Sequence, residues 1–133
     1  MNFGKAILAG VVGGIVLNVA DFVMHGLIMG DTYTKYPVFN QESASPLSFT
    51  LVAVCYAIMA SFLFAKTRSV WPEGLMGGLS FGFWGGLVGF FPPFYNSLVF
   101  EGFPYYMSWC WGGINFIGFV VLGTVLGLLY KRA

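Results

Sequence analysis

The feature that most constrains this chain is a set of four apolar segments, each about as long as a membrane-spanning helix. We expect helices over about 3–29, 46–65, 72–91 and 104–130. A helix needs about 20 apolar residues to cross the hydrocarbon core of a bilayer. Only 8% of the residues are charged, whereas soluble domains have about 25%. The sequence therefore predicts an all-α integral membrane protein, a four-transmembrane-helix bundle with short loops, in which 1–133 form a single membrane domain.

Proline and polar residues mark the ends of these helices. Ser45 followed by Pro46 is typical of a helix start, because the hydroxyl caps the first turn and proline lacks an amide hydrogen that this turn leaves unused. The Pro92-Pro93 pair stops the third helix. The segment that follows, 94–103, is too apolar for a solvated loop, so we expect it to lie in the outer membrane interface.

The positions of lysine and arginine predict the orientation. A chain with four spans places its two termini and its second loop on the same side of the membrane. That side carries Lys5, Lys66, Arg68, Lys131 and Arg132, whereas the first loop, which includes 31–45, carries Lys35. Since positive charge stays in the cytoplasm, we expect both termini to be cytoplasmic, in the cell (inner or cytoplasmic) membrane. A net charge of +1 gives no basic field for nucleic acid.

The first helix carries a stripe of small and polar residues on an otherwise apolar surface. On a helical wheel this stripe covers an arc of roughly 80° and consists of Gly10, Gly14, Asn18, Asp21 and His25. Measured from the start of the apolar zone, Asn18 lies roughly 16 Å deep, Asp21 roughly 21 Å and His25 roughly 27 Å. Lipid cannot solvate such a stripe, so it must face protein, water or a ligand.

Asp21 and His25 are one helical turn apart, so their side chains are expected to be within reach of each other. A carboxyl at this depth favours its protonated form unless a cation lies beside it. Three functions fit the pair: a proton relay, a cation site, or a carboxylate that orients a ligating imidazole. The alternative is a structural cluster that fixes the helix packing through hydrogen bonds among Asn18, Asp21, His25, Asn115 and Ser108.

His25 and the aromatic residues near the outer end suggest possible ligands. As the chain's one histidine, His25 is a candidate axial ligand for a tetrapyrrole, although a haem with two histidine ligands would need a second chain. An aromatic surface suited to a quinone, lipid, carotenoid or other pigment consists of Phe94, Tyr95, Tyr105, Tyr106, Trp109 and Trp111. An ordinary interfacial belt with helix packing explains these residues equally well. The sequence requires no cofactor.

The glycines of the third helix form a second stripe, within roughly 80° on the wheel: Gly74, Gly78, Gly82, Gly85 and Gly89. Such a smooth groove accepts another helix at close range. It fits a dimer seam or a surface for a flat cofactor, but packing inside the bundle is the more common reason for such a stripe.

The sequence lacks the groupings that catalysis or metal binding needs. Cys55 and Cys110 form no C-x-x-C pair, and no nucleophile has a histidine at suitable spacing. We therefore expect no metal site, and a membrane enzyme acting on a lipid or quinone is the least supported of three functions. The best supported is a non-catalytic accessory or binding subunit of a larger membrane assembly. Its partners would be other transmembrane subunits or a second copy of the chain. The alternative is a small proton-coupled transporter or channel, working as a homodimer with Asp21 as the coupling carboxylate.

Overall fold

The structure is a computed structural model that describes 1–39 and 45–131, and within these ranges all regular structure is helical. The elements in chain order are α1 (Phe3–Asp21), the π-helix η1 (Phe22–Ile28), α2 (Gly30–Tyr33), α3 (Pro46–Lys66), the 3-10 turn η2 (Arg68–Val70), α4 (Gly74–Phe90), α5 (Phe94–Val99) and α6 (Tyr105–Leu129). Ser45 caps α3 as expected, because its hydroxyl accepts a hydrogen bond from the amide of Ser48.

Four helical segments are long and apolar enough to cross a membrane, as expected for an all-helical protein with four spans. They are Phe3–Ile28, Pro46–Lys66, Gly74–Val99 and Tyr105–Leu129. Their mean hydropathy ranges from 1.3 to 2.2. Two parts of the sequence prediction, the first loop at 40–44 and the basic residue Arg132, lie outside the described residues.

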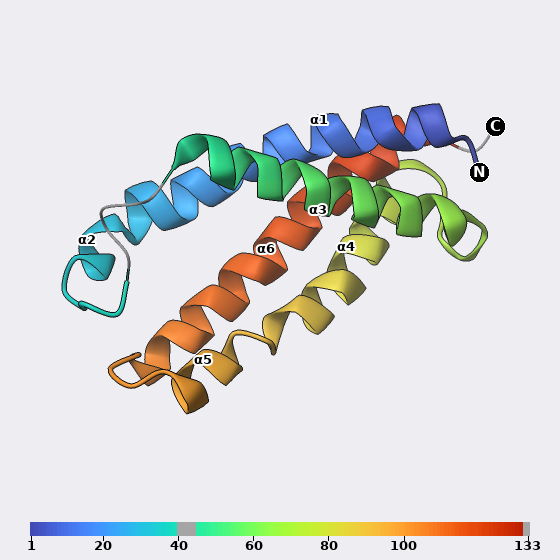
Figure 1. The fold of residues 1–133 in the computed structure, drawn as a ribbon. Helices are drawn as coiled ribbons and strands as arrows, with labels where there is room; N and C mark the ends of the chain where they lie inside the picture. The colour runs from blue at the N-terminus through green and yellow to red at the C-terminus, as the bar shows by residue number, and fades with distance from the viewer. Residues whose placement is uncertain (40–44, 132–133) are drawn as a thin grey trace.

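The spans form two antiparallel pairs, α1 with α3 and α4 with α6, and the pairs meet where α1 packs on α6 (Figure 1). The order across the bundle is therefore α3, α1, α6, α4. Both termini lie at one end, and the pairs diverge toward the end that carries α2 and α5 (Figure 1). The two inner helices, α1 and α6, hold most of the polar groups predicted for the site.

Glycine allows the close approach within both pairs. A Cβ added to Gly10 would lie 2.6 Å from the Cα of Ile58, and one added to Gly14 would lie 2.6 Å from the Cα of Val54. In the other pair, a Cβ on Gly78 would lie 2.8 Å from the Cα of Gly127. Since real Cβ atoms do not approach backbone this closely, helices packed in this way require glycine at these positions.

The first helix departs from the uninterrupted α-helix expected over 3–29. From Phe22 to Ile28 the backbone forms a π-helix, closed by a hydrogen bond of 3.1 Å from the amide of Met29 to the carbonyl of Met24. A π-turn is wider than an α-turn, so residues four apart no longer stack on one face. The third helix begins at Gly74, whose φ of +63° suits glycine, rather than at Pro72.

Candidate functional site

The inner part of the α1 stripe faces α3. Gly10 and Gly14 lie against the α3 backbone. One turn further along, Nδ2 of Asn18 donates a hydrogen bond of 3.0 Å to the hydroxyl of Thr50. Thr50 in turn donates to the carbonyl of Pro46. The Asn18 amide is therefore part of the contact between α1 and α3.

Asp21 is the exception in the stripe. Its side chain is half-buried and faces α6, where a Cβ on Gly118 would lie 3.7 Å from Oδ1 of Asp21. Within 1–39 and 45–131, no hydrogen bond or ion pair reaches its carboxyl group. This chain thus leaves one carboxyl at membrane depth without a partner among the residues described.

Tyr56, on α3, is electrostatically coupled to this carboxyl, and the sequence analysis did not single it out. It is within electrostatic range of Asp21 and its ring packs edge-on against Phe119, with centroids 5.4 Å apart. Its hydroxyl also has no hydrogen-bond partner among the described residues. Tyr56 further lines a shallow apolar hollow on α3, together with Leu51, Val52, Cys55 and Met59. No sequence pattern indicated this position for Tyr56, because tyrosine inside an apolar helix is also a common packing residue.

His25 is not bonded to Asp21, although the two are four residues apart. The π-helix turns His25 toward α2 and α6, where Nδ1 hydrogen-bonds to the hydroxyl of Tyr33. Trp111 donates from Nε1 to the same hydroxyl at 2.7 Å. A ligating Nε2 would require Nδ1 to be the donor in the bond to Tyr33.

Tyr33 is thus the centre of an aromatic cluster. From the sequence it was expected only to be part of a polar loop. Phe39 packs on it at 4.9 Å between ring centroids and on Trp111 at 5.7 Å. Burial raises the pKa of the Tyr33 hydroxyl above its usual value. The spacing of Tyr33, Tyr36 and Phe39 at every third residue is the signal that could have suggested a shared face.

The two polar residues expected in α6 make other contacts. Asn115 donates from Nδ2 to the carbonyl of Gly89 on α4 at 3.0 Å. Ser108 is fully buried and donates to the carbonyl of Pro93 at 3.0 Å. No hydrogen bond links either residue to Asn18, Asp21 or His25 within the described ranges. The structure therefore gives these polar groups separate roles in helix packing, with Asp21 left over.

The predicted aromatic surface divides into two clusters. Phe94 and Trp109 pack together at 5.1 Å and Phe94 and Tyr105 at 6.4 Å, around α5. Trp111 belongs to the Tyr33 cluster, and the Tyr106 hydroxyl joins that of Tyr36 at 2.9 Å. Tyr95 projects from α5 and is 70% exposed. The surface is therefore not one continuous platform.

The glycine stripe of α4 is covered from within the chain. Gly78 and Gly82 lie against the α6 backbone, and Gly85 and Gly89 lie against the ring of Phe119. Nothing lies within 4 Å of a Cβ on Gly74. The groove is thus occupied by α6.

Cys55 and Cys110 are free thiols. Among the described residues, no three His, Cys, Asp or Glu side chains are grouped so that they could hold a metal ion.

Together, the four apolar spans and the polar groups buried between them define the class of this protein as a multi-pass helical membrane protein. Comparison with protein-family models, with curated proteins and with solved structures gives no match to this chain.

Proposed function

We propose that this protein is a non-catalytic accessory or binding subunit of a larger membrane assembly. The observation that carries the proposal is the Asp21 carboxyl, which has no hydrogen-bond or ion-pair partner within the described residues. Polar groups at membrane depth are costly unless they are paired. A donor from another transmembrane chain would complete the site that this chain leaves open.

The surface beside Asp21 supports docking of a helix at this place. Tyr56 joins the carboxyl to the shallow apolar hollow on α3. A partner helix seated there would bury apolar side chains against α3 and bring its own donor to Asp21 and Tyr56. The glycine groove of α4 is filled by α6, so the partner or second copy would dock on α3 rather than on α4.

The arrangement in the membrane follows from charge. Lys5, Arg68 and Lys131 line one pocket together with Met1 and Asn2, at the N-terminal end of α1. By the positive-inside rule, this end faces the cytoplasm and the chain resides in the cytoplasmic membrane. The end with α2 and α5 then faces outward. The exposed rings there, Tyr95 and Tyr105 among them, would contact lipid, a quinone or a pigment.

The first test is to isolate the untagged protein from its own membranes in mild detergent and to record native mass and absorbance together. The proposal predicts a discrete complex much larger than one or two copies of the chain. Visible absorbance that travels with the complex would add a pigment and direct attention to His25. A colourless monomer or dimer would contradict the subunit proposal.

A second function, a small proton-coupled transporter or channel, is favoured by the same carboxyl. A carboxyl at membrane depth to which no hydrogen bond or ion pair is made within the described residues fits a group that takes up and releases a proton. The two functions separate in sealed vesicles that contain only this chain. Proton-driven uptake or proton leak that Asp21→Asn abolishes would establish the transporter, whereas the subunit proposal expects no flux.

A further inference from the structure

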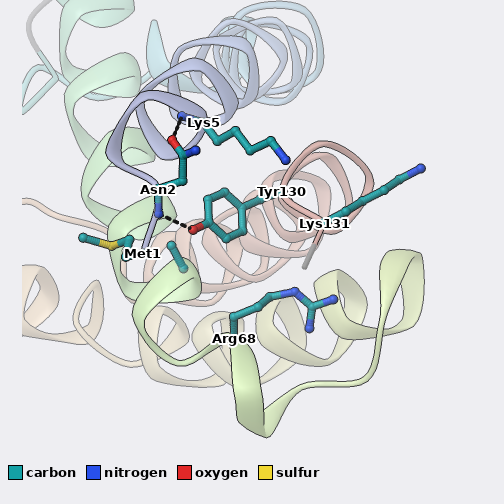
Figure 2. A pocket seen from close by; sticks show the side chains of 7 residues that line it. Met1, Asn2, Lys5, Arg68, Tyr130 and Lys131 are labelled. Carbon is teal, nitrogen blue, oxygen red and sulfur yellow. Dashed lines mark hydrogen bonds between the residues drawn. The ribbon is translucent and has the colours of Figure 1, made fainter. Parts of the chain in front are cut away.

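The end of the bundle with both termini contains a pocket of about 240 Å³. Three basic side chains from separate parts of the chain line it: Lys5 at the start of α1, Arg68 in η2 and Lys131 just after α6. Figure 2 shows Lys5 and Arg68 on two sides of Tyr130, with Lys131 extending away from the ring. None of the residues that line the pocket is acidic.

Arg68 gives the pocket a fixed wall. It is only 6% exposed, although arginine is rarely buried. Its Nη1 donates to the carbonyls of Trp71 at 3.0 Å and Pro72 at 2.9 Å, and its guanidinium lies 5.4 Å from the centre of the Phe64 ring. The guanidinium is therefore positioned by the fold rather than by solvent.

On the other side of the pocket, hydrogen bonds join residues near the two ends of the chain. The amide of Asn2 donates to the hydroxyl of Tyr130 at 3.0 Å, and Oδ1 of Asn2 accepts from the amide of Lys5 at 3.0 Å (Figure 2). Tyr130 is itself buried against the core. These bonds fix the chain segments that carry Lys5 and Lys131 next to each other, and both lysines line the pocket.

We propose that this pocket binds a phosphate group, and that its source is the headgroup of an anionic phospholipid. Lys5 and Lys131 bring two cations from different segments to a pocket whose lining has no acidic residue, beside the guanidinium that Arg68 holds in its wall, and this grouping favours an anion. The pocket lies where α1 begins and where α3 and α6 end, which is the depth of lipid phosphates. Basic pockets between transmembrane helices bind such headgroups.

Apolar side chains around the pocket favour a lipid over a soluble phosphate. Phe3, Val70 and Leu129 each lie within two positions of a lining residue in the sequence, and each is exposed. Acyl chains below the headgroup would cover such residues, whereas inorganic phosphate would leave them uncovered.

The test is native mass spectrometry of the purified full chain, titrated in detergent with phosphatidylglycerol or with phosphatidylcholine of the same acyl chains. We expect phosphatidylglycerol to bind more tightly to the wild type. Lys5→Gln and Lys131→Gln should each weaken that binding about fivefold. Lys35→Gln, at the other end of the bundle, is the matched control and should change nothing.

Equal binding of the two lipids, or equal loss in Lys35→Gln, would overturn the proposal. A parallel titration with inorganic phosphate separates the two sources. The lipid proposal predicts that phosphate at the same concentration displaces little phosphatidylglycerol. Full displacement that depends on Lys5 and Lys131 would overturn the lipid as the source. Far-UV circular dichroism establishes that each variant is folded, so that loss of binding reports on the pocket.

Discussion

The indole nitrogen of Trp111 donates a 2.7 Å hydrogen bond to the hydroxyl of Tyr33, which also bonds to His25. This contact joins the segment after the first span to α6, at the end where the two helix pairs diverge (Figure 1). It ties together two parts of the bundle that have no glycine contact there. The cluster around Tyr33 therefore replaces close helix packing at this end.

Tyr33→Phe should destabilise the protein because it leaves the Trp111 indole N–H and the His25 ring without their partner. We expect a loss of about 1–3 kcal/mol in the free energy of unfolding. Equilibrium unfolding in mixed detergent micelles measures it. Tyr95→Phe, on an exposed ring of α5, is the control and should stay within about 0.5 kcal/mol. Equal losses in the free energy of unfolding for the two variants would contradict the role of the Tyr33 hydroxyl in this cluster.

The same hydroxyl should show a characteristic dependence on pH. Burial raises the pKa of Tyr33 in the folded protein, so folding favours the protonated form. Its contribution to stability is complete below the unfolded pKa, about 10, and is lost as pH rises through the folded pKa. The tyrosinate absorbance of wild type minus that of Tyr33→Phe measures this titration. A midpoint at or below that of free tyrosine would contradict the buried position.

Gly78→Ala should disrupt the contact between α4 and α6. The added Cβ would meet the backbone of Gly123 and Gly127, and backbone cannot move aside as a side chain can. We expect a loss of about 3 kcal/mol or more, at the upper end of overpacking effects, seen as a lower thermal midpoint or a lower yield of folded protein. Gly113→Ala meets open space and should be tolerated. Comparable losses at both positions would argue against this packing.

The bond between Asn18 and Thr50 should be worth little more than an average contact inside a membrane protein. A double-mutant cycle with Asn18→Leu and Thr50→Val should give a coupling of about 0.6 kcal/mol, and at most about 1.7 kcal/mol. Unfolding in detergent provides the four free energies. A coupling of zero would mean that the two side chains do not interact.

The four spans could be predicted from the sequence because their signal is local. Length, hydropathy and the Ser45-Pro46 start each depend on neighbouring residues only, and α3 begins where they indicate. The glycine stripe of α4 could also be found, since its spacing follows the helix. The helix that packs against this stripe could not be predicted, because the glycine spacing is the same whether α6 or a partner chain lies there.

The site depended on features that the sequence does not display. Asp21 and His25 appear as neighbours on an ideal α-helix, but the π-helix from Phe22 to Ile28 separates them. The stripe from Gly10 to His25 follows the period of an ideal α-helix, so it gives no indication of the wider turn. Tyr33 and Tyr56 could be recognised as site residues only from interactions between elements that lie far apart in the chain.

The glycines of α4 are poor positions for testing contact with a partner chain. In the sequence, the glycine stripe that includes Gly82 and Gly85 also fitted a dimer seam. In the structure Gly82 faces the α6 backbone and Gly85 faces the ring of Phe119. Gly82→Leu and Gly85→Leu would both disturb the fold of the chain itself, so only substitutions at Asp21 and Tyr56 report on a partner.

The most direct test compares the native mass of wild type, Asp21→Asn and Asp31→Asn after extraction from their own membranes. Asp31 is an exposed carboxyl beyond the first span, so Asp31→Asn is the matched control. We predict a discrete large complex for the wild type and for Asp31→Asn, and free chain for Asp21→Asn. A wild type that runs as free chain, or an Asp21→Asn variant that remains in the same complex, would contradict the account.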